Sequence, residues 1–134
     1  MEVRRVASES GRVRVVGTQS RQDAVWNVVG PPTSDRDSRA HWHGEAVLEP
    51  EPTNPHDPNA VRVVVDGQMV GYLERALAAR LQPALLELER RGVRVAAPCH
   101  AVGGFEWPEG GRASVGLVLS FDPEELLAET GASG

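Results

Sequence analysis

Four prolines placed directly before a β-branched segment constrain the fold of this chain more than any other feature. They fall within residues 49–60, and residues 61–65 read Val-Arg-Val-Val-Val. Each proline fixes its own φ and restricts the residue before it, and β-branched residues favour strands. The sequence therefore predicts a rigid, shaped loop that leads into a strand, and a loop of this length is often a binding loop. The prolines are Pro50, Pro52, Pro55 and Pro58.

A β-hairpin follows this loop. Asp66-Gly67 is a strong signal for a two-residue hairpin turn. Residues 68–73, which read Gln-Met-Val-Gly-Tyr-Leu, then pair back as the second strand. This hairpin is predicted from purely local signals.

Short strands account for much of the remainder. Residues 12–17 alternate as in a half-buried first strand, and residues 40–48 form a second. Residues 93–97 return to strand, and residues 114–121 read as the closing strand. The short apolar segment at residues 24–29 fits either a strand or a helix.

Four leucines at helical spacing predict a helical region after the hairpin, and Gly92 is placed to end it. Pro83 interrupts the middle of this region. Proline inside a helix costs about 3 kcal/mol, so the sequence predicts two short helices or one that restarts near Pro83. The leucines are Leu77, Leu81, Leu85 and Leu88.

The length of 134 residues predicts one domain. Residues 1–11 are expected to be a flexible lead-in, and residues 12–122 the folded domain with a flexible loop at residues 30–39. Residues 123–134 form an acidic tail, in which residues 124–129 are expected to form at most a frayed helix. No apolar run approaches the ~20 residues of a membrane span, and no apolar segment follows the N-terminal arginines, so we expect no membrane association and a cytoplasmic location. The single cysteine, Cys99, fits a reducing compartment.

Two stretches together carry a family resemblance. Residues 54–61 read Asn-Pro-His-Asp-Pro-Asn-Ala-Val, and residues 66–73 read Asp-Gly-Gln-Met-Val-Gly-Tyr-Leu. This combination resembles the signature of HIRAN domains, and the similarity extends from residues 15–17 to about Phe121. The resemblance identifies a stand-alone bacterial member. It implies a mainly β fold, an OB-like small β-barrel with one or two short helices between strands. Strand patterning alone would equally fit another small α+β fold.

The resemblance also implies a function and a site. Eukaryotic HIRAN domains capture the 3′ end of single-stranded DNA, which implies a role in DNA repair or processing beside a helicase or nuclease partner. The carboxylate that reads the 3′-hydroxyl matches Asp57, its neighbour matches His56, and the basic position after the hairpin matches Arg75. At a helix start, Arg75 could hold a phosphate with help from exposed backbone N–H groups. The alternative is that Asp57 and Asn59 only hydrogen-bond the backbone of the loop as Asx turns.

One part of the family pattern is missing. DNA-end-binding relatives place an arginine and two tyrosines after the first strand, where this chain has Gln19, Ser20 and Arg21. Arg21 can stack on a base or contact phosphate in their place. Phe105 or Trp107, in a turn-rich segment where the family also supplies an aromatic residue, can offer a further stacking surface.

Charge and motifs narrow the function classes. Every basic residue is arginine and the formal net charge is −5, so a DNA site must be a local arginine patch. A protein-protein interaction module that keeps the HIRAN fold is the alternative.

His41 and His43 share a strand face and Cys99-His100 could add ligands, but no spacing matches a zinc module, so no metal or other cofactor is expected. No catalytic motif is present, which predicts a binding module and not an enzyme.

Overall fold

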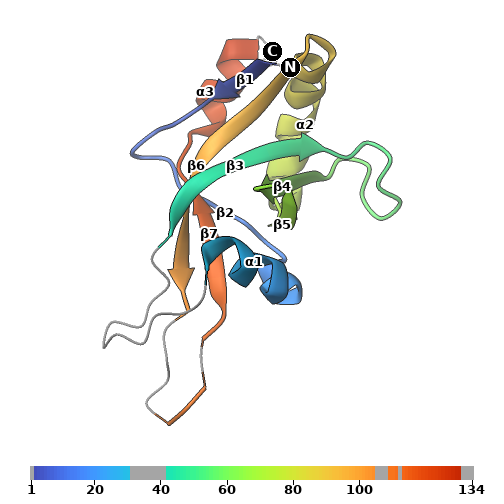
Figure 1. The fold of residues 1–134 in the computed structure, drawn as a ribbon. Coiled ribbons are helices and arrows are strands. Elements are labelled where there is room, and N and C mark those ends of the chain that lie inside the picture. The colour runs from blue at the N-terminus through green and yellow to red at the C-terminus, as the bar shows by residue number, and fades with distance from the viewer. Residues whose placement is uncertain (1, 31–41, 105–108, 112, 131–134) are drawn as a thin grey trace.

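The computed structural model describes residues 2–30, 42–104, 109–111 and 113–130. Within these residues, seven strands form one curled sheet, with α2 and α3 at one end and α1 at the other (Figure 1). The strands are β1 (Glu2–Arg5), β2 (Val13–Arg14), β3 (His43–Pro50), β4 (Val61–Val65), β5 (Gln68–Tyr72), β6 (Val93–Gly103) and β7 (Val115–Leu119). The helices are the 3-10 helix η1 (Thr18–Arg21), α1 (Gln22–Val29), α2 (Arg75–Arg90) and α3 (Pro123–Thr130).

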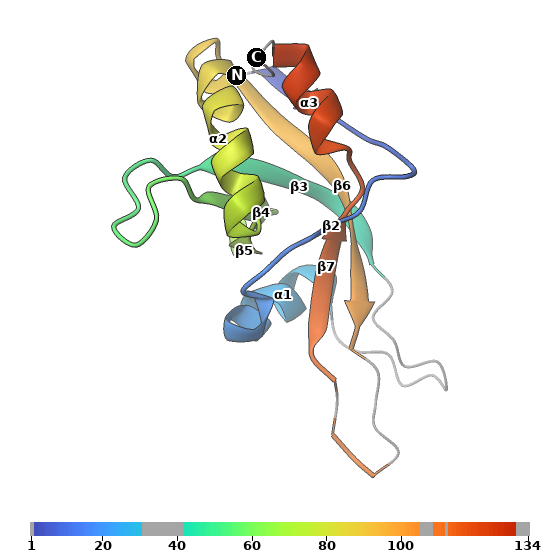
Figure 2. The same cartoon turned by 180° about the vertical axis from the view of Figure 1, so that it is seen from behind.

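The sheet closes on itself as a small barrel. Its strand order is β2-β7-β6-β3-β4-β5, and these neighbours pair antiparallel. The two ends of this order meet where the backbone of Val16 exchanges hydrogen bonds of 2.8 and 2.9 Å with that of Tyr72. The view from behind shows the blue segment that contains β2 running past β7 and on towards α1 (Figure 2). The mainly β, OB-like barrel expected from the sequence is thus confirmed.

The hairpin of β4 and β5 is also confirmed. Asp66 and Gly67 adopt φ values of 50° and 77°, the left-handed conformations that a two-residue turn of this kind requires. The pairing shifts register between Val63 and Val64, so a β-bulge bends the hairpin beside the junction with Val16.

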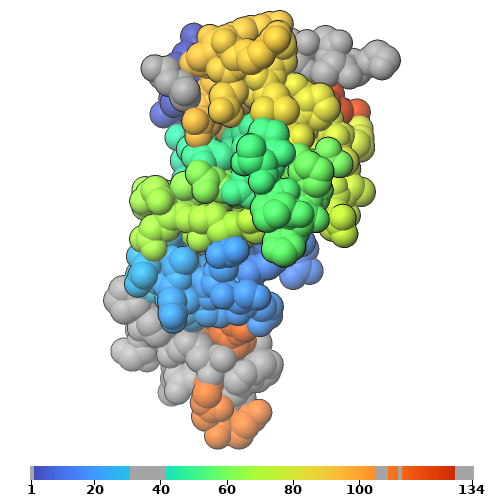
Figure 3. Space-filling view, turned by 90° about the vertical axis from the view of Figure 1, so that its right-hand side faces the viewer, coloured from blue at the N-terminus to red at the C-terminus, as the bar shows by residue number. Residues whose placement is uncertain are grey.

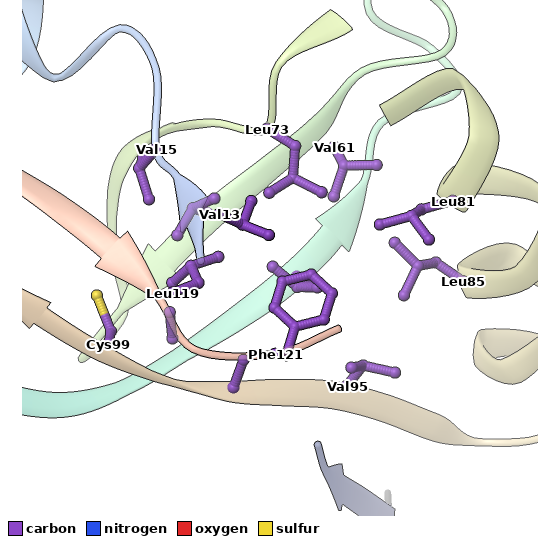
Figure 4. Packing of buried hydrophobic residues seen from close by; sticks show 14 of the residues in the cluster. Val13, Val15, Val61, Leu73, Leu81, Leu85, Val95, Cys99, Leu119 and Phe121 are labelled. Atoms are coloured by element: carbon purple, nitrogen blue, oxygen red, sulfur yellow. The ribbon is translucent and has the colours of Figure 1, made fainter. Parts of the chain in front are cut away.

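The core lies between the inner face of the sheet and α2. The predicted leucine stripe of α2 contributes Leu81 and Leu85, which face Phe121 and the inward valines of the strands (Figure 4). Phe121 itself is completely buried, and a well-packed aromatic side chain of this size is a major contributor to a small core.

Both ends of the chain are more structured than the sequence indicated. The expected flexible lead-in contains β1, which pairs in parallel with β6 from Glu2 to Arg5. The acidic tail contains α3, whose Leu126 and Leu127 are buried in the core while Glu124 pairs with Arg80 of α2. In the sequence, two adjacent leucines among acidic residues were the feature that could have indicated a packed helix. Most of the loop predicted at residues 30–39 lies outside the described residues.

The undecided segment at residues 24–29 is helical. Gln22, at the start of α1, donates through Nε2 to the carbonyls of Thr18 and Val115, and its Oε1 accepts from the Val115 N–H. Val25 is completely buried beneath it. Contacts to β7, which is distant in sequence, therefore favour a helix over a strand for this segment.

The expectation that Pro83 divides its helix was wrong. Helix α2 runs without interruption through Pro83. Pro83 and Ala79, the residue whose carbonyl loses its hydrogen bond, are both exposed, so water can satisfy that carbonyl. The buried face on the other side of the helix holds the two halves together.

No helix among the described residues is long and apolar enough to cross a membrane.

Candidate functional site

The loop between β3 and β4, residues 51–60, is called the proline-rich loop. A pocket of about 430 Å³ opens where this loop meets the junction that closes the barrel. Figure 3 shows the loop in green and the blue residues of η1 and α1 on one face of the molecule, with β5 in lime between them. The pocket brings together Asp57, His56, Arg75 and Arg21, which the sequence had singled out from three separate segments. Its lining residues are Val16, Arg21, Asn54, His56, Asp57, Ala60, Tyr72, Leu73 and Arg75.

The loop holds its shape through two Asx interactions. The Asn54 side-chain oxygen accepts from the backbone N–H of His56 at 2.8 Å and of Asp57 at 3.1 Å. Asp57 Oδ1 accepts from the Asn59 N–H at 3.0 Å. Asp57 therefore does have the structural role considered above, but through one carboxylate oxygen only.

The second oxygen of Asp57 faces the pocket. Oδ2 lies 3.5 Å from Arg75 Nε, while 19 % of the Asp57 side chain and 83 % of the Arg75 side chain are exposed. An ion pair with one partner this exposed contributes little to stability, so Arg75 can leave Asp57 at small cost. The carboxylate is thus fixed in position and its acceptor oxygen is within reach of a ligand.

A buried glutamine of α2 anchors the end of the loop. Gln82 is 6 % exposed, and its Nε2 donates to the carbonyls of Pro58 at 2.7 Å and Ala60 at 3.0 Å. Sequence reasoning missed Gln82. Its signal was a polar residue next to Leu81 on an otherwise apolar helix face, where a buried amide is expected to have a backbone partner.

Tyr72 forms one wall of the pocket and was not singled out as a site residue from the sequence. The guanidinium carbon of Arg21 lies 5.8 Å from the centre of the Tyr72 ring, a cation–π distance. Burial, followed by a hydrogen bond to Glu51, raises the pKa of Tyr72, and the positive charge of Arg21 acts in the opposite direction. The Gly-Tyr-Leu at the end of the hairpin could have indicated Tyr72 as a site residue, because it places an aromatic side chain at the end of β5.

A ladder of charges on the outer face of the sheet supports the loop. Glu49 of β3 lies between Arg62 of β4 and Arg94 of β6, with 2.7 Å between Arg94 Nη1 and Glu49 Oε2. Arg62 Nη1 also lies 3.7 Å from Glu51 Oε2, and Glu51 is one of the groups that raise the pKa of Tyr72. The hydrogen bond to Glu49 raises the pKa of Arg62 further above its already high value. These ion pairs therefore connect Glu51 of the proline-rich loop to β4, and β4 to β3 and β6.

The start of α2 differs from the sequence expectation. The Glu74 side chain caps this helix, accepting from the backbone N–H of Ala76 at 3.1 Å and of Leu77 at 3.4 Å. These N–H groups are therefore already occupied by a carboxylate and do not form a phosphate site with Arg75. What Arg75 offers a phosphate is its own guanidinium.

Comparison with known proteins settles the family. The HIRAN domain model matches residues 9–104, which include the loop, the hairpin and most of the sheet. The chain belongs to the HIRAN domain family. β1, β7 and α3 of this HIRAN domain lie outside the matched residues.

Two solved structures are similar to this chain. The crystal structure of the HIRAN domain of human HLTF has a TM-score of 0.40 and 20% identity, and the match covers 96% of this chain and 92% of that one. The NMR structure of the HLTF HIRAN domain has a TM-score of 0.37 and 21% identity, covering 90% and 88%. No curated protein sequence matches.

The remaining candidate residues lie elsewhere or outside the described chain. Gln19 is exposed and accepts from the Ser114 hydroxyl at 3.1 Å, and Ser20 is exposed on η1, so neither lines the pocket of this HIRAN domain. Phe105 and Trp107 lie outside the described residues.

Cys99 does not lie with His43 and His100, the two described histidines that the sequence suggested as possible metal ligands beside it. His43 and His100 stack across β3 and β6 with ring centres 5.9 Å apart, and burial together with the charges of His43 and Arg12 lowers the pKa of His100. Cys99 points to the opposite face, into the core, where burial raises the pKa of its thiol to about 12. Among the described residues no three His, Cys, Asp or Glu side chains lie together as metal ligands do, and His41 is outside them.

Proposed function

We propose that this HIRAN domain binds single-stranded DNA by a free 3′ end, which it takes into the pocket beside the proline-rich loop. The observation that carries the proposal is the gathering of a fixed carboxylate, two arginines and an aromatic ring around one cavity of about 430 Å³. Each group has a counterpart on a nucleotide terminus: a hydroxyl for the carboxylate, phosphates for the arginines and a base for the ring.

Asp57 reads the terminal hydroxyl. Because Oδ1 is held by the Asn59 N–H, Oδ2 is left to accept a hydrogen bond from a 3′-hydroxyl after Arg75 moves aside. A hydrogen bond to a charged group contributes about 1.5–3 kcal/mol. A 3′-phosphate in the same position has no hydroxyl to donate and is repelled by the carboxylate.

Arginine and tyrosine supply the remaining contacts. Arg75, displaced from Asp57, pairs with the terminal phosphodiester, and the Tyr72 ring with Arg21 above it forms a surface for a base. Stacking contributes about 1–3 kcal/mol per base. Arg21 and Tyr72 thereby replace the missing tyrosines after the first strand.

The proposed activity is recognition without turnover. HIRAN domains are binding modules, and an end-binding module serves DNA repair or processing by delivering a terminus to a helicase or nuclease partner. We propose such a role for this chain, and its family and its pocket support the proposal.

A protein-interaction module is the alternative, and one observation favours it. The net charge is −5, and most described arginines are already paired with carboxylates, so the surface lacks a broad positive field. Salt dependence separates the two functions, since phosphate contacts release counterions and weaken steeply as salt rises.

Fluorescence anisotropy tests the proposal. The probes are short single strands ending in a free 3′-hydroxyl or a 3′-phosphate, with Asp57→Asn as the matched variant, because an amide oxygen can still accept from the Asn59 N–H and keep the loop in shape. We expect the wild type to prefer the hydroxyl roughly ten- to a hundredfold and the variant to lose that preference. Equal affinity for both ends, or no binding at low salt, would reject end recognition and favour the protein-interaction function.

A further inference from the structure

Two groups stand out among the arginines that the structure describes. Most that the structure describes have a carboxylate partner: Arg5, Arg62, Arg75, Arg80, Arg90, Arg91 and Arg94. Within the described residues, Arg12, Arg14 and Arg21 have no carboxylate within ion-pair distance. All three come from one segment of ten residues in a chain of net negative charge.

This segment leads directly out of the pocket. Val13 and Val15 point into the core, so the alternation of the strand places Arg12, Arg14 and Val16 on the outer face. Val16 is 39% exposed and lines the pocket, as Arg21 does from η1. Arg14 and Arg12 are therefore the next two outward positions on the strand that leaves the pocket.

The spacing of these arginines suits a nucleic-acid backbone. Alternate residues of a strand lie about 7 Å apart, comparable to the distance between successive phosphates of an extended single strand. A positive groove or stripe that tracks the backbone is what sequence-independent binders of single strands use. Unpaired guanidinium groups provide it without first breaking an ion pair.

We propose that Arg14 and Arg12 form a phosphate track for a single-stranded nucleic acid whose 3′ end occupies the pocket. The strand leaves past Val16 and runs along the outer face of β2, so Arg14 receives the phosphate nearer the end and Arg12 the next one in the 5′ direction. The track rests on the proposed function, because the pocket fixes which end of the strand enters. It adds a direction and a footprint longer than the terminal nucleotide.

The test measures affinity against length and salt. Oligothymidylates from dinucleotide to octanucleotide, all with a free 3′-hydroxyl, are titrated into the wild type, R12Q/R14Q and R90Q/R91Q. The last variant is the matched control, because it also removes two positive charges, from Arg90 at the end of α2 and from the following Arg91, both of which pair with Glu87. Thermal melting checks that each variant is folded; should R12Q/R14Q fail to fold, Arg12→Gln and Arg14→Gln are used singly.

We expect wild-type affinity to rise with length until the track is filled, and R12Q/R14Q to bind longer strands several-fold more weakly while keeping its affinity for the dinucleotide. The slope of log K against log salt should fall by about 1.4, or about 0.7 for each single variant, since each phosphate contact on a single strand contributes about 0.7. The control should match the wild type.

Two results would overturn the track. One is a length dependence that R12Q/R14Q leaves unchanged, and the other is an equal loss in R12Q/R14Q and R90Q/R91Q, which would show an effect of net charge alone. If Asp57-dependent preference for the 3′-hydroxyl persists without any gain from length, the track fails and the proposed function stands. If the wild type binds no oligonucleotide, both fail.

Discussion

Tyr72 links the closure of the barrel to the candidate site. Its backbone pairs with Val16, its ring faces Arg21, and the nearby Glu51 of the loop raises the pKa of its hydroxyl. A ligand that stacks on the ring therefore also contacts the residue that joins the loop to the barrel. Asp57 has a similar double role, with one oxygen used by the loop and the other available to a ligand.

The ionisation of Tyr72 can be measured directly, because it is the only tyrosine in the sequence. Burial and the bond to Glu51 raise its pKa, so tyrosinate absorbance should appear above the ordinary midpoint of about 10. Arg21→Gln should raise that pKa further by removing a positive charge. A group whose pKa is higher in the folded than in the unfolded state contributes stability that is fully present below the unfolded-state pKa. This contribution is lost as the pH rises through the folded-state pKa. Tyr72→Phe should therefore flatten the alkaline loss of stability; a midpoint at or below 10 would contradict the described environment.

The elements of this domain differ in how far local sequence determined them. The β4–β5 hairpin followed from Asp66-Gly67 and β-branched runs, because its signals are local. The prolines predicted a shaped loop, but the hydrogen bonds of Asn54, Asp57 and Gln82 that hold its shape were not predicted in full. Asp57 and Arg75 were singled out by the family resemblance. The type of α1 could not be predicted, since Gln22 is fixed by the backbone of Val115, far along the chain. Continuity of α2 was missed because tertiary packing outweighs the cost of Pro83.

Replacing Pro83 should stabilise the domain. Pro83→Ala restores an N–H that can donate to the Ala79 carbonyl, and the helical preference for alanine exceeds the entropy that proline removes from the unfolded chain. We expect the free energy of unfolding in urea to rise by about 2 kcal/mol. Unchanged or lower stability would mean that the ring of this exposed residue makes contacts the structure does not contain.

At the scale of the whole molecule, closure of the barrel creates the pocket. Val16 and Tyr72 are far apart in sequence, so no local pattern indicates that they pair; the resemblance implied a barrel, and the structure locates its junction. Gly71 permits the close approach, since a Cβ there would lie 2.5 Å from the Val16 carbonyl oxygen and 2.6 Å from Val15 Cγ1. The ends of the chain add β1 and α3, whose buried leucines make the acidic segment part of the core.

A side chain at Gly71 should therefore open the junction. Gly71→Ala is expected to lower the free energy of unfolding by about 1–3 kcal/mol and to weaken oligonucleotide binding, because it displaces the wall that Val16 and Tyr72 share. Gly116→Ala in β7 is the matched control, as its Cβ would meet a Val102 methyl at 3.3 Å, which can adjust, and the Val102 carbonyl oxygen at an ordinary contact distance of 4.0 Å. Equal urea midpoints for the two variants would argue against a tight junction.

Backbone amide chemical shifts of isotope-labelled protein test whether a free 3′ end occupies the pocket. During titration with a short single strand bearing a 3′-hydroxyl, we expect the largest shifts at Arg21, His56, Asp57 and Tyr72, and smaller ones with the 3′-phosphate. Amides of α3, at the other end of the molecule from α1, should not move (Figure 1). Shifts concentrated away from the loop and the junction, or the same pattern with both ends, would contradict it.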